Sequence, residues 1–532
     1  MDSILTVPFK KQDLKFFNCY YTHIYSYLSS KSFPIELLLY KCLQEPHKLF
    51  QHFIGKGQSR WNYFFTTNID GKTNSIFDKE DLECIGLVEN IKKNSFSGCI
   101  ELIQTTIKNN RILFLMVDPF YLPHSDHYQK VHGGHWIMIT GYDELSQKIN
   151  ILDEKFTFYE FYEYGINIIK DGYENGAQET LFFTDINVNY DRLKERYVRF
   201  FENYQPTMEC FFNESLELLH QQKTAIEKSG KLCEQLYHML NFLSGSIQSC
   251  RIFLEYIRIP KPHINQMVKI SFDLENMASV IKKFEVTNQI NFTYIEGKIT
   301  EIKDVLDSVI GYLKSHDFSR HIHKLNLGQV IEENQKQWSF GGGEADEYEE
   351  PQKGKENFVD LQAFFNNQGF GVEGSTADFT GSGEFFLVDN LKEIDKVVTC
   401  DPIHFRLSSL FGLGKDNISC TEQVINLNGI YKKMWLLGCG EWGDATGQIV
   451  VKYEDNYIET FNIQLTDWAW EPKYGEKLAL SSPIFRKEKI DFAPDKGSLF
   501  AKSISLDETR RILNVQLPFC PNLHVFSITL TS

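Results

Sequence analysis

The stretch YLPHSDHYQKVHGGHWIMITGYDELSQKINILDEKF, residues 121–156, decides how the N-terminal region of this 532-residue chain folds. Apolar residues run through HWIMITGYD and again through KINILD, which predicts two buried strands joined by the turn YDELSQKI. His135 opens the first strand directly after a Gly-Gly turn, and Asp153 ends the second strand. A hairpin would bring these two ends side by side, so that the carboxylate of Asp153 could orient the imidazole of His135.

A cysteine at the start of an amphipathic helix is the second feature that bears on function. In FFNCYYTHIYSYL (16–28) the apolar residues fall three and four apart, and Cys19 falls in the first turn, near the positive end of the helix dipole. A free thiol has a pKa of about 8.5, so it becomes a useful nucleophile only where a helix N-terminus or an imidazole favours the thiolate. Cys19 is therefore a buried core residue, a metal ligand or a nucleophile. The order Cys19, His135, Asp153 is that of papain-like folds.

Composition limits the classes of partner and compartment. A net charge of −16 without a dense Lys/Arg block argues against nucleic acid or an anionic membrane as a partner. The N-terminus lacks the pattern of a signal peptide, and no apolar run is long enough to span a membrane. Eleven cysteines are scattered singly, with no CxxC pair, which favours a reducing cytoplasm over a disulfide framework or a zinc ribbon. We expect a cytoplasmic protein.

Changes in sequence pattern divide the chain into three domains and a linker. Residues 1–200 mix helical and strand patterns, which predicts an α+β domain. Apolar residues three and four apart over 205–340 predict a helical bundle with a break at the PKP sequence, 260–262. The sequence GGGEADEYEEPQKGKEN (341–357) has no apolar face and predicts a linker. Short strands between Gly, Asn and Asp turns over 358–532 predict an antiparallel β-sandwich of the jelly-roll type.

The N-terminal motifs, taken together, resemble a known family. A cysteine-bearing helix, the run VDPFYLPHSDHYQKVHGGHWIMITGYDE (117–144) and a strand ending in Asp resemble the N-terminal domain of the butirosin biosynthesis protein H family, over about residues 8–185. The resemblance implies a papain-like cysteine fold. It also implies an acyltransferase of antibiotic biosynthesis that moves an acyl or aminoacyl group from a carrier-protein thioester to an amine. A helical segment after this domain is usual in that family, whereas the β domain is not part of its founding member's plan.

The resemblance implies roles for single residues as well. Cys19 is expected to be the nucleophile, His135 the base and Asp153 the orienting acid. We expect three nearby residues to bind substrate: Tyr121, His132 and Gly134. The donor is expected on the phosphopantetheine of an acyl or peptidyl carrier protein and the acceptor to be a small-molecule amine, with no metal and no cofactor in the protein itself.

The residues alone are compatible with several further functions. The same triad would serve a cysteine peptidase or amidase, because both reactions pass through an acyl-enzyme. A third possibility is a non-catalytic scaffold whose C-terminal domain binds a glycan on a platform of tryptophans: Trp435, Trp442, Trp468 and Trp470. Loop histidines could instead hold a metal, namely His127, His132 and His135, and His132 also rivals His135 as the base.

Residues upstream of Cys19 raise two further questions. Papain-like enzymes usually place a Gln six residues before the nucleophile to donate to the oxyanion, and here Asp13 takes that position beside Gln12. The donor is either Gln12 or the backbone N–H groups of the Cys19 helix. Three lysines form the best candidate for a carrier-docking patch, or else ordinary solvated surface: Lys10, Lys11 and Lys15.

Overall fold

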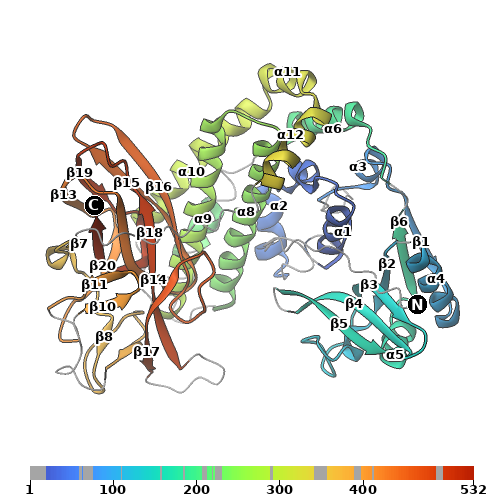
Figure 1. Cartoon of the computed structure of the whole chain (residues 1–532), viewed down its shortest axis with the longest axis horizontal. Coiled ribbons are helices and arrows are strands. Elements are labelled where there is room, and N and C mark those ends of the chain that lie inside the picture. Colours follow the sequence, from blue (N-terminus) through green and yellow to red (C-terminus); the bar gives the residue numbers. More distant parts are fainter. Residues whose placement is uncertain are drawn as a thin grey trace.

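The computed structural model describes residues 19–58, 63, 76–109, 111–155, 158–183, 186–205, 213–218, 220–221, 230–287, 292–340, 356–388, 397–409, 412–486 and 495–532. The predicted oxyanion and docking residues upstream of Cys19 lie outside this set, as does the predicted linker up to residue 355. An N-terminal sheet and a C-terminal pair of sheets lie at opposite ends of the molecule, with long helices between them (Figure 1).

The N-terminal part is built on a six-stranded antiparallel sheet in the order β1-β6-β2-β3-β4-β5. Its strands are β1 (Glu89–Lys93), β2 (Leu113–Val117), β3 (His135–Asp143), β4 (Lys148–Lys155), β5 (Phe158–Gly165) and β6 (Glu179–Phe183). The two strands predicted from residues 135–153 are thus adjacent, as β3 and β4. Mixed helices and strands confirm the predicted α+β character of this region.

Both faces of the central strands of this sheet are buried, which explains their continuous apolar runs. Leu113 and Leu115 pack on one side with residues of α4 (Phe96–Lys108) and α5 (Ile166–Asn175). Phe114, from the same strand, belongs to a second core on the other side, where α1 (Cys19–Ser30) packs. The remaining helices of this part are α2 (Pro46–Phe50), α3 (Lys79–Cys84) and α6 (Tyr190–Asn203), with the short helical elements η1 (Ile35–Cys42), η2 (Gln51–Gly55) and η4 (Pro119–Tyr121).

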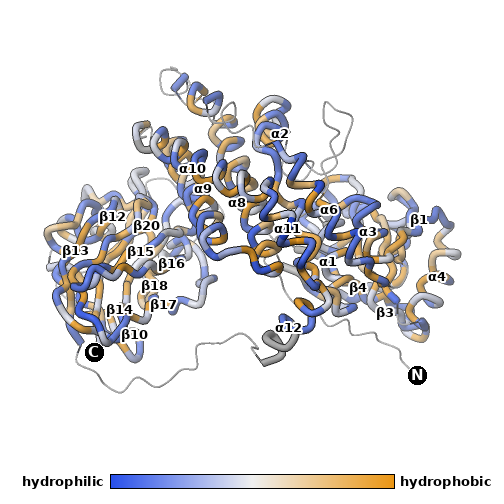
Figure 2. Tube along the Cα trace, turned by 90° about the horizontal axis from the view of Figure 1, so that it is seen from above, coloured by the Kyte–Doolittle hydropathy of each residue, from blue (hydrophilic) through white to orange (hydrophobic). Residues whose placement is uncertain are grey.

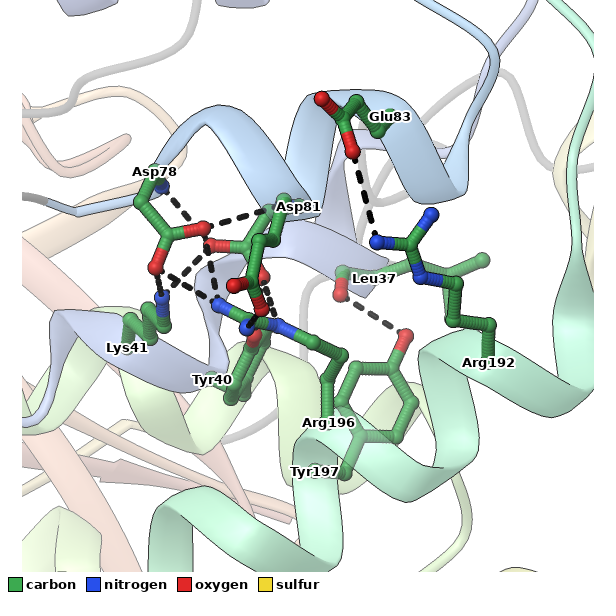
Figure 3. Close-up of polar contacts among 10 residues, drawn as sticks. Leu37, Tyr40, Lys41, Asp78, Asp81, Glu83, Arg192, Arg196 and Tyr197 are labelled. Carbon is green, nitrogen blue, oxygen red and sulfur yellow. Dashed lines mark hydrogen bonds and ion pairs between the residues drawn. The ribbon is translucent and has the colours of Figure 1, made fainter.

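A cluster of charges ties η1, α3 and α6 together (Figure 3). The buried carboxylate of Asp81 accepts hydrogen bonds from the hydroxyl of Tyr40 at 2.5 Å, from Nζ of Lys41 at 2.7 Å and from Nε of Arg196 at 2.7 Å. Asp78 caps α3 and also accepts from Arg196, at 2.7 Å. Breaking such a buried pair from one side is costly, so this cluster fixes the three elements to one another.

The middle of the chain is helical, as predicted, where it is described: α8 (Gly230–Tyr256), α9 (Lys261–Thr287), α10 (Phe292–Leu313), α11 (His316–Lys324) and α12 (Leu327–Phe340). Hydrophilic and hydrophobic residues alternate along α8, α9 and α10 (Figure 2), which is typical of helices that bury one face. Their buried side chains belong to the same core as those of α1, so the helices and the sheet pack as one body. Among the described residues no helix combines the length and apolarity needed to cross a membrane.

The C-terminal part is a β-sandwich, as the strand pattern predicted. The larger sheet runs β12-β20-β14-β18-β17-β9-β8, with β7 paired to β20, and the smaller runs β13-β19-β15-β16. One apolar core joins them. The strands are β7 (Glu356–Phe358), β8 (Phe370–Gly371), β9 (Phe385–Leu387), β10 (Val397–Cys400), β11 (Ile403–Arg406), β12 (Ile418–Thr421), β13 (Val424–Gly429), β14 (Lys433–Gly440), β15 (Ala445–Tyr453), β16 (Ile458–Leu465), β17 (Lys477–Phe485), β18 (Lys496–Ser505), β19 (Ile512–Gln516) and β20 (Phe519–Thr531), with one short turn of helix, η5 (Gln362–Phe364).

Helix α9 joins the sandwich to the rest of the molecule through polar contacts. Nζ of Lys283 pairs with the buried carboxylate of Glu441, which also lies 3.1 Å from Nε2 of His524. Burial opposes ionisation of Glu441, yet the charges of Lys283 and His524 outweigh it and hold the pKa of that carboxyl below its usual value. A buried charge pair therefore lies at the junction of the helices and the sandwich.

Candidate active site

One buried carboxylate lies where the start of β3 meets the end of β4. The β3–β4 ladder begins at the pair Met138–Leu152, so His135 and Asp153 lie just beyond the paired residues of these strands. There Nε2 of His135 lies 2.8 Å from Oδ1 and 2.9 Å from Oδ2 of Asp153. The structure brings together two of the three residues that were given catalytic roles from the sequence. The roles themselves stay predictions.

A second histidine, His124, shares the same carboxylate. Its Nε2 lies 2.9 Å from Oδ2 of Asp153, and its Nδ1 lies 2.9 Å from the hydroxyl of Tyr164. Burial raises the pKa of Tyr164, so the hydroxyl keeps its proton and donates it to Nδ1. Nε2–H of His124 then donates to Asp153. Tyr162 stacks on the ring at 3.9 Å between centroids and holds it in this orientation.

His124 has no role in the predictions made from the sequence, although it lies in the same loop as His127 and His132. The signal that could have found it is the alternation of aromatic residues in FYEFYEYG, the sequence of β5. Tyr162 and Tyr164 lie two apart and so face the same side of a strand that pairs with β4, which carries Asp153. Two aromatic side chains beside a buried carboxylate indicate that a further ring packs there.

A third histidine comes from α1. Nε2 of His23 lies 2.6 Å from the carbonyl oxygen of Trp136, the residue after His135, and 3.8 Å from Oδ1 of Asp153. Burial lowers the pKa of His23 to about 4, although the charge of Asp153 acts in the opposite direction. At neutral pH this ring is therefore uncharged, and its Nε2–H donates to the Trp136 carbonyl. The bond fixes α1 against the start of β3.

Asp153 is ionised in this environment. Burial opposes the charge, but the charge of His135 and the hydrogen bonds from His124 and His135 together hold the pKa of Asp153 well below its usual range. A fully buried carboxylate that stays ionised can orient an imidazole and stabilise its protonated form.

Cys19 is the first residue of α1, and its side chain lies outside the described part of the structure. His23 follows it by four residues, and residues four apart share a face of an α-helix. Cys19 therefore begins the face of α1 that meets β3 next to His135. The nine described cysteines are buried, and none of them belongs to α1.

The predicted substrate-binding residues lie on the chain that connects β2 to β3. Tyr121 ends η4, and Gly134 immediately precedes β3 in an exposed position. His132 lies two residues earlier, with its Nδ1 2.7 Å from Oδ2 of Asp118. The structure therefore gives His132 a carboxylate of its own and does not join it to Asp153. Substrate binding by these residues stays a prediction.

Two of the three loop histidines considered as metal ligands have carboxylate partners. His132 is bonded to Asp118 and His135 to Asp153. Within the described ranges no group of three or more His, Cys, Asp or Glu side chains is arranged to hold a metal ion.

The four tryptophans considered as a glycan platform differ in exposure. Trp468 is buried in the sandwich core, whereas Trp470 is exposed. Burial of Trp468 removes its ring from any platform at the surface. Glycan binding by the remaining tryptophans stays a prediction.

Comparison with known proteins bears on both ends of the chain. Residues 355–532 match the family model of the AziU2-like β-sandwich domain. This match agrees with the two packed sheets and places the start of the sandwich immediately before β7.

The chain is also similar to a transferase of Niallia circulans, at 18% identity over 309 residues, which is 57% of this chain and 98% of that protein. By its name, that protein transfers 4-(gamma-L-glutamylamino)-(S)-2-hydroxybutanoate to ribostamycin from the acyl-carrier protein BtrI. The similarity is weak. It supports the resemblance to the butirosin biosynthesis protein H family loosely, and it supports a biosynthetic acyltransferase in general terms.

Proposed function

We propose that the chain is an acyltransferase of secondary-metabolite biosynthesis that moves an acyl or aminoacyl group from a carrier-protein thioester, through Cys19, to a small-molecule amine. One observation carries the proposal. One turn after Cys19, His23 is bonded to the carbonyl of Trp136, next to the imidazole that is bonded to buried Asp153. The similarity to a carrier-protein-linked transferase supports the same reaction class.

The proposed fold of the N-terminal region is papain-like: a helix that begins with the nucleophile packs against a sheet that carries the base and its orienting acid. The contacts between α1 and β3 support this assignment. For the sandwich we propose the jelly-roll type. We propose a cytoplasmic protein, in keeping with eleven cysteines that are scattered singly along the chain without a CxxC pair.

The proposed reaction has two half-reactions. Nε2 of His135 is bonded to Asp153, so Nδ1 is the nitrogen that exchanges a proton with the thiol of Cys19. The thiolate attacks the thioester carbonyl, the carrier thiol leaves with the proton from His135, and Cys19 holds the acyl group. The amine then attacks the acyl-enzyme, and its proton passes to Nδ1 of His135. The N-terminal end of α1 favours the thiolate and offers backbone N–H groups to the oxyanion.

Trapping of the acyl-enzyme tests the proposal. Incubation with an S-acyl pantetheine should add the mass of one acyl group to the intact protein, and digestion should locate it on Cys19. Cys19→Ala should remove the adduct and the turnover without loss of the folded state. Cys210→Ala is the matched control and should keep both the adduct and the turnover. Cys19 and Cys210 are the two cysteines outside the nine that are described, and those nine are buried from the reagent.

Three results would overturn the proposal. Unchanged acylation of Cys19→Ala would remove the nucleophile. Release of the acyl group to water at the same rate with and without saturating amine would indicate a hydrolase. Failure of any thioester to acylate the wild-type protein would indicate a scaffold without catalysis.

A further inference from the structure

A second histidine–aspartate pair lies beside the candidate site. Nδ1 of His132 is 2.7 Å from Oδ2 of Asp118, and the imidazole stacks on the ring of Phe120 at 4.1 Å between centroids and 15° between planes. The side chain of Asp118 is 6% exposed, whereas that of His132 is 65% exposed. The pair thus combines a fixed carboxylate with an imidazole that water and solutes reach.

Asp118 is held in place from several sides. Its Oδ1 accepts the backbone N–H of Phe120 at 3.1 Å and that of Gly133 at 3.2 Å, and its own backbone N–H donates to the carbonyl of Gly172 at 2.8 Å. Burial opposes its charge, but the hydrogen bonds from His132 and from the two amides outweigh that effect and lower the pKa of Asp118. An ionised carboxylate only accepts hydrogen bonds, so Nδ1 of His132 carries the proton that it donates, and in the neutral ring Nε2 carries the lone pair.

The two pairs lie at the same end of the sheet. Val117 is the β2 partner of His135 across the β2–β3 ladder, and Asp118 is the next residue of the chain. His132 precedes His135 by three residues. Asp118 after the end of β2 thus holds the loop residue His132, while Asp153 holds His135 at the start of the neighbouring β3, so each imidazole has its own carboxylate.

A transfer to an amine needs two proton acceptors. A primary alkylamine with the pKa of a lysine side chain, about 10.4, is uncharged in only about one molecule in 2,500 at pH 7, so it arrives as an ammonium ion. An ammonium nitrogen has no lone pair and must lose one proton before it can attack. It loses a second proton as the amide forms. In the proposed function His135 takes only the second.

We propose that His132 is the base that removes the first proton, and that the acceptor is a primary amine bound as its ammonium ion. This inference rests on the proposed acyl transfer through Cys19. Nε2 of His132 takes one proton from R–NH3⁺, and the amine nitrogen attacks the acyl carbonyl. The C–S bond to Cys19 then breaks while the second proton passes to His135. The positive charge formed on His132 lies beside Asp118, and the exposed ring returns the proton to water.

The proposed reaction is balanced in atoms and charge. Acyl thioester and R–NH3⁺ give amide, carrier thiol and one H⁺, with no oxidation or reduction. Hydrolysis of the same acyl-enzyme has no such step, because water carries no surplus proton. A surface base beside the triad therefore distinguishes a transferase to amines from a hydrolase.

The experiment compares His132→Gln with His127→Gln, an exposed histidine of the same loop. Acyl-enzyme is formed from S-acyl pantetheine, and its decay is followed with ethanolamine, which is an ammonium ion at neutral pH, or with hydroxylamine, which is largely uncharged. His132→Gln should slow transfer to ethanolamine by on the order of a hundredfold at pH 7. The ratio of the ethanolamine rate to the hydroxylamine rate should therefore fall in His132→Gln, whereas His127→Gln should keep the wild-type ratio. The deficit should shrink as the pH rises toward the pKa of the amine.

Equal losses with ethanolamine and hydroxylamine would overturn the inference, since they would indicate that His132 only shapes the loop. A loss that is the same at pH 7 and pH 9 would overturn it too. An unaffected His132→Gln variant would remove the second base but leave the acyltransferase standing. If the wild-type protein forms no acyl-enzyme, the proposed function fails and this inference fails with it.

Discussion

Acidification should loosen α1 through one residue, His23. Its pKa is about 4 in the folded protein and about 6.5 in an unfolded chain, so the unfolded state binds the proton first as the pH falls. A group that is less basic when folded contributes no penalty above its unfolded pKa. Below pH 6.5 it destabilises the folded state progressively, until the folded pKa is reached near pH 4.

The size of this effect follows from the two pKa values. Each unit of difference corresponds to about 1.4 kcal/mol, so the full difference is about 3 kcal/mol, reached near pH 4. Between pH 7 and pH 5 the loss is about 2 kcal/mol, since part of the titration lies below pH 5. His23 is 1% exposed, so solvent screening does not reduce this figure appreciably.

Hydrogen exchange of the α1 amides measures the free energy of opening that exposes His23. We compare the wild-type protein with His23→Gln, because Gln can donate to the carbonyl of Trp136 but does not titrate. The wild-type free energy should fall by about 2 kcal/mol more than that of the variant between pH 7 and pH 5. His127→Gln, a change at an exposed site, should follow the wild type. Parallel pH dependence in wild type and His23→Gln would refute the buried, uncharged assignment of His23.

Three further predictions concern other parts of the chain. Asp153→Asn should lower kcat by on the order of a hundredfold and His135→Ala by more, measured with S-acyl pantetheine and amine, because the orienting acid is not itself the base. Lys283→Met should lower the urea stability of the sandwich by about 3 kcal/mol, since it leaves Glu441 charged and buried, whereas Lys282→Met on the same helix should cost under about 1 kcal/mol. Charge reversal of the lysines upstream of α1, namely Lys10, Lys11 and Lys15, should raise KM for a carrier-bound thioester and weaken the salt dependence of that KM. The KM for a small thioester should stay unchanged.

The sequence predicts those parts of the site that depend on local pattern. The juxtaposition of His135 and Asp153 follows from two apolar strands joined by a short turn, because a hairpin leaves its two free ends together. The sandwich follows in the same way from short alternating strands. Both features are encoded within stretches of a few tens of residues.

The shell around Asp153 depends on contacts between distant stretches, and the sequence alone does not predict it. His124 meets Tyr164 across forty residues, and His23 meets Trp136 across more than a hundred. His23 lies on a helix whose periodicity tells which face is apolar but not which element covers it, and His124 lies in a turn that has no periodicity. The shared core of α1 and the long helices escapes prediction for the same reason, since an amphipathic stripe does not name its partner.

The three imidazoles around Asp153 differ in how far water reaches them, and this difference selects the one that can carry a proton. The side chain of His135 is 17% exposed, that of His124 3% and that of His23 1%. Burial disfavours a charged ring, and one carboxylate can balance only one positive charge. Both ring nitrogens of His124 are already engaged, one with Asp153 and the other with the Tyr164 hydroxyl. The proton therefore belongs to His135, the ring that lies nearest to solvent and next to the start of α1. If His124→Gln moved the acid limb of the pH–rate profile as far as a change at His135 does, the charge would be shared and this argument would fail.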